Sequence, residues 1–354
     1  HKSAHVVSPP TGADFCRNRR MKQVQRIWSS RQNSCYASAR KFGRDQVAIS
    51  IGVIGLGKIA QDQHLPCIAK NSDFKLAAVV SSRPSDLGVP SFKTPAEMLA
   101  SATLDAVAIC TPPSLRRNIA LECLTQGAHL LLEKPPTPTI SEFADLKAKA
   151  SASGKVVFQT WHSRFNKAVA EAKRLLAGQK VTRLHVSWKE SVWQWHPGQE
   201  WIWEPGGFGV FDPGINALSI VTEIMPEPVF VDSADIITPS NRFTPIAANI
   251  KFRAANGGDA CLTAEFDWRQ KGEQSWNIDI DTASHKLKLT HGGTRLLVDG
   301  IETVAAPSEE YEEIYTRFAE LIKTGKSEMD GSPLELVADC MMLGRRSDTD
   351  PFIW

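Results

Sequence analysis

The chain has 354 residues, of which 42% are hydrophobic and 23% are charged, and its formal net charge is +2. These values are typical of globular proteins, so they exclude intrinsic disorder or a coiled coil as the main architecture and give no case for nucleic-acid binding. No run of about 18 apolar residues occurs, so we expect no transmembrane helix, and the length suits two domains.

Residues 1–47 form a basic segment with ten Lys and Arg and only two acidic residues, whereas residues 48–354 carry 31 basic and 37 acidic residues. An organellar transit peptide is one interpretation, because such peptides are rich in Arg and Ser and poor in acids. Arg19-Arg20 is compatible with a twin-arginine signal, but no apolar stretch follows it. We favour translated upstream sequence, with the natural start near Met21 or later, and expect residues 1–46 to be disordered.

The seven cysteines are scattered singly, without a CxxC pair. This distribution is typical of reduced thiols in a cytoplasmic protein, and no metal-ligand pattern accompanies it, so we expect no bound metal.

From Val47 onward, short apolar strands alternate with helices, which is typical of βαβ units in a doubly wound parallel sheet. We therefore predict an α/β fold with an N-terminal Rossmann domain over residues 47–165. Its strands are expected at 47–54, 74–80, 105–110, 128–132 and 156–160. Its helices are expected in a stretch that follows Ala60 and reaches Lys70, and at 96–102, 115–126 and 141–151.

After Asn166 the pattern changes to long strands separated by Gly-rich turns. It predicts a C-terminal α+β domain over residues 166–354 with a large, mostly antiparallel open sheet, and such a sheet favours a homodimer or homotetramer. Strands are expected at 183–190, 229–236, 246–253, 261–268, 276–281, 286–290 and 295–298, and helices at 167–176, 309–322 and 333–343.

The first strand runs directly into Gly55-x-Gly57-x-x-Ala60 and a helix. In a dinucleotide-binding turn the first Gly allows the tight turn and the second lets the backbone approach a pyrophosphate, which the helix N-terminus then stabilises. A plain glycine turn is the alternative. The strand–turn–helix context favours an NAD(P) site.

The end of the second strand bears on the choice of cofactor. An acidic residue there would bind the ribose 2′-hydroxyl of NAD, but the chain instead carries Ser82 and Arg83. A hydroxyl and a guanidinium suit the 2′-phosphate of NADP, so we favour NADP over NAD. A solvated loop is the alternative.

Two further segments carry candidate catalytic side chains. Lys134 follows a buried strand, at the sheet edge where ligands bind, although a Lys before two prolines is also compatible with a solvated turn. Asp212 follows a Gly-rich loop and precedes Pro213, and Asn216 lies one helical turn further on. The spacing fits both a helix N-cap at Asp212 and a catalytic pair of Asp212 and Asn216.

These motifs together resemble the glucose–fructose oxidoreductase / inositol dehydrogenase (Gfo/Idh/MocA) family. The resemblance covers about residues 47–354, and it is carried by Gly55-Leu-Gly-Lys-Ile-Ala60, Glu133-Lys-Pro135 and a Gly-Gly loop that leads into Asp212-Pro-Gly-Ile-Asn216. Longer stretches, such as Thr160-Trp-His-Ser-Arg164 and Trp201-Ile-Trp-Glu-Pro-Gly-Gly207, are similar to the branch that oxidises L-arabinose and D-galactose at C1.

The resemblance implies an NAD(P)-dependent aldose 1-dehydrogenase that converts a pyranose to its lactone by hydride transfer to nicotinamide. It implies Lys134 as a substrate-orienting residue and Asp212 as the general acid/base, with Asn216 where most of the family has His. The alternatives are an NAD-dependent glycoside hydrolase, another sugar or inositol dehydrogenase of the family, or a nucleotide-sensing regulator. The residues expected to bind the cofactor are Gly55, Gly57, Lys58, Ile59, Ser82, Arg83, Thr111, Pro112, Glu133 and Lys134.

Eight of the ten tryptophans lie between Trp161 and Trp276. Aromatic planes cover the apolar C–H faces of sugars, while polar neighbours bond the hydroxyls. Core packing is the competing interpretation for each Trp. The residues expected to bind the sugar are His162, Arg164, Glu190, Trp195, Trp203 and Trp268, with an interdomain ion pair as the alternative for Arg164.

Overall fold

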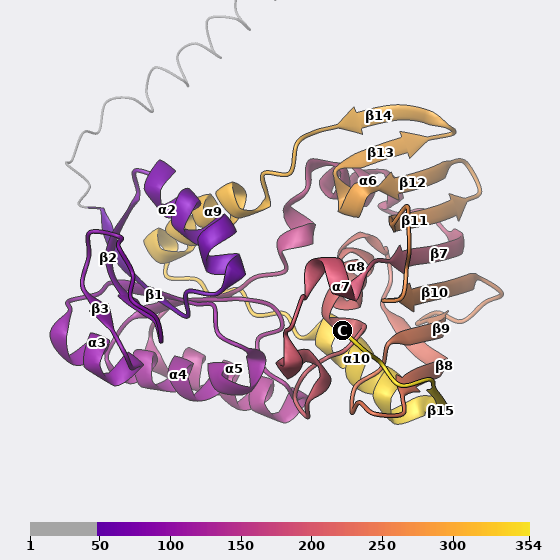
Figure 1. Cartoon of the computed structure of the whole chain (residues 1–354). Coiled ribbons are helices and arrows are strands. Elements are labelled where there is room, and N and C mark those ends of the chain that lie inside the picture. Colours follow the sequence, from indigo (N-terminus) through magenta and orange to yellow (C-terminus); the bar gives the residue numbers. More distant parts are fainter. Residues whose placement is uncertain (1–47) are drawn as a thin grey trace, which may run out of the picture. The chain divides into compact units, whose positions relative to one another are not determined.

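The computed structural model describes residues 48–354, so the predictions for residues 1–46 lie outside it. A six-stranded parallel sheet opens the described chain, in the order β3-β2-β1-β4-β5-β6 (Figure 1). Its strands are β1 (Ile49–Ile54), β2 (Phe74–Val80), β3 (Ser91–Phe92), β4 (Ala106–Ile109), β5 (His129–Leu132) and β6 (Val157–Gln159). The strand order reverses between β1 and β4, and in open α/β sheets ligands bind outside the carboxyl ends of the strands at such a point.

Helices cover both faces of this first sheet. On one face lie α3 (Pro95–Ser101), α4 (Pro113–Thr125) and α5 (Ile140–Ser153), whose apolar side chains pack with those of β1, β2, β4 and β5. On the other face lie α2 (Leu65–Lys70), which follows the π-helical segment η1 (Ala60–His64), and α9 (Glu310–Thr324). The predicted doubly wound architecture is confirmed. The presence of α9 in this core is a finding that strand and helix periodicity did not indicate.

The second sheet has nine strands in the order β14-β13-β12-β11-β7-β10-β9-β8-β15. All neighbouring pairs are antiparallel except β7–β10 and β8–β15, so the predicted mostly antiparallel sheet is confirmed. Its strands are β7 (Val181–Lys189), β8 (Val229–Pro239), β9 (Ala247–Ala254), β10 (Cys261–Asp267), β11 (Ser275–Thr282), β12 (Lys286–Thr290), β13 (Arg295–Val298), β14 (Ile301–Ala305) and β15 (Gly344–Thr349).

Three helices pack their apolar side chains into the core of the second sheet, namely α6 (Lys167–Leu176), α8 (Phe211–Ile224) and α10 (Ser332–Leu343). Short helical segments connect the longer elements: η2 (His162–Phe165), α7 (Val192–Trp195), η3 (Glu200–Trp203) and η4 (His291–Gly293). The division of the chain at residue 165 stays a prediction, because α9 joins the core of the first sheet although it follows the second sheet in sequence.

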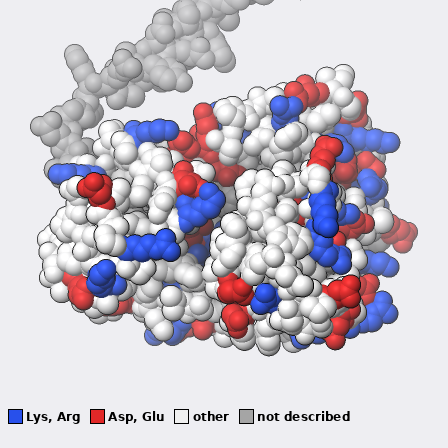
Figure 2. Space-filling model, in the orientation of Figure 1, with Lys and Arg blue, Asp and Glu red and all other residues white. Residues whose placement is uncertain are grey.

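Three further observations concern the part of the chain that the structure describes. Among residues 48–354, no helix is long and apolar enough to cross a membrane. The five cysteines in this range have free thiols. On the face drawn in Figure 2, basic and acidic side chains are interspersed and neither sign forms one continuous area.

Candidate active site

The turn after β1 has the features that a dinucleotide needs. Gly55 has a φ of +93°, which other residues rarely adopt. At Gly57 no atom lies within 4 Å of the position that a Cβ would take, so the backbone there is open to a ligand. Beside the turn, the buried Thr111 hydroxyl has no hydrogen-bond partner among the described residues. These observations fit an NAD(P) pyrophosphate and ribose, with Lys58 and Ile59 at the start of the helix and Pro112 beside Thr111.

The end of β2 carries the side chains predicted to select the cofactor. Ser82 and Arg83 are both exposed. The Arg83 backbone N–H donates to the Ser81 hydroxyl at 3.1 Å, and the Lys93 ammonium lies 3.4 Å from the Ser82 carbonyl oxygen. Two cationic side chains therefore flank this loop, and a phosphate is a suitable ligand for them.

The central contact of the site joins Lys134, just after β5, to Asp212, in the first turn of α8. The Lys134 ammonium donates to the Asp212 carbonyl oxygen at 2.9 Å and to its carboxylate Oδ1 at 3.2 Å. Both side chains are largely buried, since 14% of the Lys134 side chain and 8% of the Asp212 side chain are exposed. The fold thus brings together the two predicted catalytic residues from positions far apart in the sequence.

Asp212 is not a helix cap, so that alternative is wrong. α8 begins at Phe211, with Val210 at the N-cap position, and no side chain caps the helix. The carboxylate faces Lys134 and His196 instead, with Oδ2 lying 3.6 Å from His196 Nε2. Burial raises the pKa of Asp212, but the positive charges of Lys134 and His196 outweigh it and hold the pKa below its usual value. Asp212 is therefore ionised at neutral pH, as a general base must be.

Glu190 follows β7 and is also buried. Its Oε1 accepts a hydrogen bond from the Trp268 indole at 3.2 Å, and its Oε2 accepts one from the Trp276 indole at 2.8 Å. Burial raises the pKa of this carboxyl, and the charge of Asp212 raises it further. The indole hydrogen bonds and the nearby His196 lower the pKa, but burial outweighs them. A carboxylate has about four acceptor sites, so Glu190 can still accept bonds from two ligand hydroxyls.

His162 is near enough to Lys134 to feel its charge. Its Nδ1 is 2.9 Å from Glu310 Oε2, and its ring stacks on Tyr311 with centroids 5.8 Å apart. Burial lowers the pKa of His162, but Glu310 outweighs it and the pKa is raised. On α8, Asn216 lies one helical turn beyond Asp212.

Several predicted site residues have other roles in this structure. Arg164 donates to the Asp330 carboxylate at 2.6 Å and to the Ser219 carbonyl at 2.8 Å, so it joins structural elements, as its alternative interpretation held. Trp203 and Trp268 are 1% and 0% exposed and belong to the core of the second sheet, which leaves no ring face for a sugar. Trp195 is different, because it is 40% exposed while its indole donates to Gln274 at 2.8 Å, and its role in sugar binding stays a prediction.

Glu133 was expected among the cofactor-binding residues, but its carboxylate bonds to protein groups. Oε1 accepts from the Tyr311 hydroxyl at 2.8 Å and lies 2.9 Å from His64 Nε2, and Oε2 accepts from the Lys134 backbone N–H at 3.0 Å. Only 2% of the residue is exposed. The structure therefore does not place this side chain where a cofactor could contact it.

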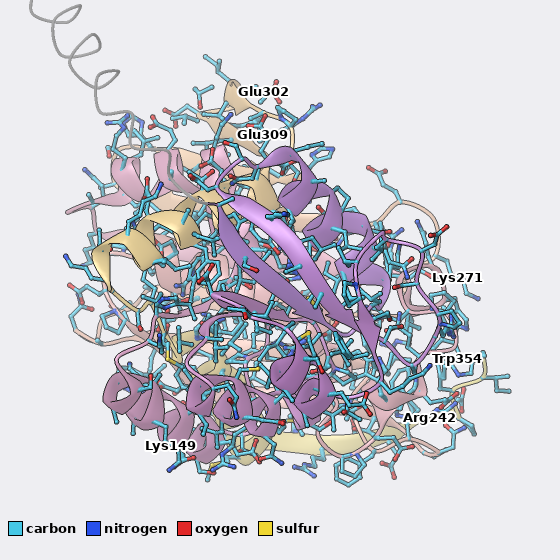
Figure 3. The ribbon with its side chains drawn as sticks, turned by 90° about the vertical axis from the view of Figure 1, so that its left-hand side faces the viewer. Lys149, Arg242, Lys271, Glu302, Glu309 and Trp354 are labelled. Atoms are coloured by element: carbon cyan, nitrogen blue, oxygen red, sulfur yellow. The ribbon has the colours of Figure 1, made fainter. Side chains whose placement is uncertain are left out.

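His196 belongs to the site, and the sequence pattern gave no sign of it beyond its place beside Trp195. The segment that carries it, residues 193–200, is held by Arg242 and by the last two residues of the sequence, Ile353 and Trp354. Glu200 accepts hydrogen bonds from Arg242, at 3.1 Å, and from Trp354, which lie close together in Figure 3. The Trp193 indole donates to the Ile353 carbonyl at 2.9 Å. Both ends of the segment are thereby anchored around His196.

Comparison with known proteins adds four findings. A family model described as "Oxidoreductase family, NAD-binding Rossmann fold" (GFO_IDH_MocA) matches residues 49–160. The chain is 41% identical over 309 residues to galactose 1-dehydrogenase of Pseudomonas fluorescens. The aligned region covers 86% of this chain and 98% of the relative. The crystal structure of D-galactose-1-dehydrogenase from Rhizobium etli matches with a TM-score of 0.83 and 48% identity, covering 88% of this chain and all of that one. A 3-ketoreductase from Actinomadura kijaniata, in complex with NADP, shares the fold with a TM-score of 0.73 at 17% identity.

Proposed function

The chain belongs to the Gfo/Idh/MocA oxidoreductase family, and on that premise we propose that it is an NAD(P)-dependent sugar 1-dehydrogenase that oxidises D-galactose and L-arabinose to their lactones. The observation that carries this proposal is the buried contact between Lys134 and Asp212, 3.2 Å apart, at the carboxyl edge of the first sheet. The identity to galactose 1-dehydrogenase over nearly the whole relative supports the choice of sugar.

The chain's own residues supply the proton chemistry. When bound, NAD(P)+ supplies the hydride acceptor for C1. Asp212, kept ionised by Lys134 and His196, takes the proton from the C1 hydroxyl directly or through one water. The Lys134 ammonium stabilises the negative charge that develops on that oxygen, and Asn216 orients the hydroxyl. His162 and Glu190 bind the other ring hydroxyls.

An absorbance assay tests the reaction class. With free D-galactose and NADP+ or NAD+, we expect net accumulation of the reduced cofactor in proportion to the sugar consumed. A glycoside hydrolase of the same fold would re-reduce its intermediate, so it would release sugar from a galactoside with no net reduced cofactor. That second result would contradict the proposal.

NADP+ is the favoured cofactor, because Arg83 and Lys93 flank the loop at the end of β2. We expect Arg83→Ala to weaken NADP+ binding by about 10–150-fold, the equivalent of a charge-assisted contact of about 1.5–3 kcal/mol, and to change NAD+ binding little. Titration of tryptophan fluorescence with each cofactor measures both constants. Arg345→Ala, on an exposed edge strand, is the control. An equal loss for NADP+ and NAD+ would mean that Arg83 does not contact the 2′-phosphate.

We also propose a homodimer or homotetramer in the cytoplasm. The edge strand β15 is preceded by Met342 and Leu343, which are 84% and 58% exposed, and apolar side chains of this size favour burial against another surface. The mass in solution, measured by light scattering, tests the oligomeric state.

A further inference from the structure

We infer that Glu133 is a positioning residue, which fixes the backbone of Lys134 through a buried network with His64 and Tyr311 and so places the Lys134 ammonium against Asp212. This inference rests on the roles proposed above for Lys134 and Asp212. It assigns a role to three buried polar residues that the proposed chemistry does not otherwise use.

Three elements that are distant in sequence meet at the Glu133 carboxylate. His64 ends the π-helical segment η1, just after the dinucleotide-binding turn, and Tyr311 lies in the first turn of α9. Both are within hydrogen-bond distance of Oε1, at 2.9 Å and 2.8 Å. Oε2 accepts the backbone N–H of Lys134 at 3.0 Å, and Arg116 donates to the Glu133 carbonyl oxygen at 2.7 Å. Because both oxygens of its carboxylate have hydrogen-bond partners, the Glu133 side chain is held in one orientation.

The charges in the network favour that position. Burial lowers the pKa of His64, but its contacts with Cys110, Tyr315 and Glu133 outweigh burial and raise the pKa above its usual value. Burial raises the pKa of Glu133, but the bond and the charge of His64 outweigh it and the pKa is well below its usual value. The two residues therefore form a buried ion pair. Separating the two partners of such a pair would leave a buried charge without compensation, which is strongly unfavourable. The Glu133 carboxylate is therefore held beside His64.

The consequence for the site is geometric. The Lys134 backbone N–H bonds to Glu133, and its ammonium bonds to Asp212. If the anchor is lost, the ammonium can move away from Asp212, and misplacement of a catalytic group by about 1 Å can cost about 100-fold in rate.

Movement of Lys134 would also change how the rate depends on pH. A mutation that only destabilises the fold would not have this effect. The charged and titratable groups around Asp212 are the cations of Lys134 and Arg116, the imidazole of His196 and the carboxyl of Glu190. Lys134 is the largest of the influences that lower the pKa of Asp212. When it moves away, burial has the greater weight and the pKa of Asp212 rises. The acid limb of the rate profile should then shift to higher pH.

The test compares two tyrosines on the same helix. Tyr311 bonds Glu133, whereas Tyr315 bonds the other nitrogen of His64 at 2.9 Å, and both are buried. We expect Tyr311→Phe to lower kcat by about 3–10-fold and to move the acid limb of kcat up by at least about 0.5 pH unit. Tyr315→Phe leaves every bond to Glu133 in place, so it should lower kcat less than Tyr311→Phe does and should not move the acid limb. Glu133→Gln keeps one acceptor oxygen, puts an NH₂ group in place of the other and removes the charge that pairs with His64, so it should lower kcat by about 10–100-fold.

Binding and melting measurements separate the possible outcomes. The Kd for NADP+ and the KM for galactose should stay within about threefold in Tyr311→Phe, because neither ligand loses a contact. If Tyr311→Phe and Tyr315→Phe lower kcat and Tm equally without moving the acid limb, the network serves packing alone and the inference is overturned. Should Glu133→Gln fail to fold, the tyrosine pair still decides.

The test of the proposed function is a different one. If Asp212→Asn keeps its activity, the proposed function itself is contradicted. If Asp212→Asn loses activity while Glu133→Gln and Tyr311→Phe keep the wild-type kcat and acid limb, only the positioning inference fails.

Discussion

Asp212→Asn is expected to lower kcat by about 10²–10⁴-fold, since the amide keeps the size of the side chain but cannot take a proton from the C1 hydroxyl. Asp212 is 6% exposed and contacts Lys134 and His196. Steady-state rates with galactose and NADP+ measure the effect. Asp330→Asn is the control, because Asp330 also pairs with a cation, Arg164, but lies outside the proposed site. It should keep kcat within about threefold.

The difference in stability between the wild type and Asp212→Asn should depend on pH. The folded-state pKa of Asp212 lies below its usual value, so ionised Asp212 stabilises the fold at pH values above that usual value, about 4. This contribution is lost as the pH falls through the lower folded-state pKa. The melting temperature of Asp212→Asn should therefore be a few degrees lower than that of the wild type at pH 7, and the gap should close in acid. Full activity with a large fall in Tm would show that Asp212 is structural and that the base lies elsewhere.

Discrimination between sugars is the second large effect expected. D-Galactose and L-arabinose share the ring configuration from C1 to C4, and galactose adds only a CH₂OH group at C5. An added carbon group changes preference by about 10–200-fold, so kcat/KM for the two sugars should agree within about two decades. Glucose differs from galactose at C4 alone, and its equatorial hydroxyl would leave buried polar partners such as Glu190 without a bond. Sites of this kind reject such an analogue by up to about 10⁴-fold.

Initial rates with the three sugars measure this prediction. 6-Deoxy-D-galactose is a useful control, because it keeps the axial C4 hydroxyl and lacks only the oxygen at C6. It should be oxidised nearly as well as galactose. A preference for glucose or xylose over both expected sugars would contradict the choice of substrate but not the reaction at C1.

Much of the fold could be predicted because its elements have strong local signals. The boundaries of β12 and β13 match the prediction, since both strands lie next to Gly-containing turns, and β12 also alternates between polar and apolar residues. β14 (Ile301–Ala305) and β15 (Gly344–Thr349) were missed. Both are short strands at the edges of the sheet, and β15 has no apolar side chain. Their pairing depends on neighbours rather than on their own sequences.

The candidate site was predicted in part for a related reason. Lys134 and Asp212 follow local patterns at the ends of elements, and the structure brings them into contact. His196 and Tyr311 carry no such pattern, because their place depends on tertiary contacts with Asp212 and Glu133. The tryptophans illustrate the converse. Trp203 and Trp268 lie beside polar motif residues in sequence, yet their rings fill the core, since side-chain direction was not readable from position alone.

The packing of α9 on the first sheet has a consequence for the order of events during protein synthesis. The strands of this sheet are complete at Gln159, but Tyr315 and Phe318, which pack on Phe74 and Phe158, arrive only with α9. At about 5–20 residues per second, the ribosome needs on the order of 10–30 s to add the chain from β6 through α9. During that interval one aromatic face of the nucleotide-binding half has no cover. The nascent chain is thus a substrate for chaperones and proteases until α9 emerges, and a chain that stops before Glu310 keeps that exposed face permanently.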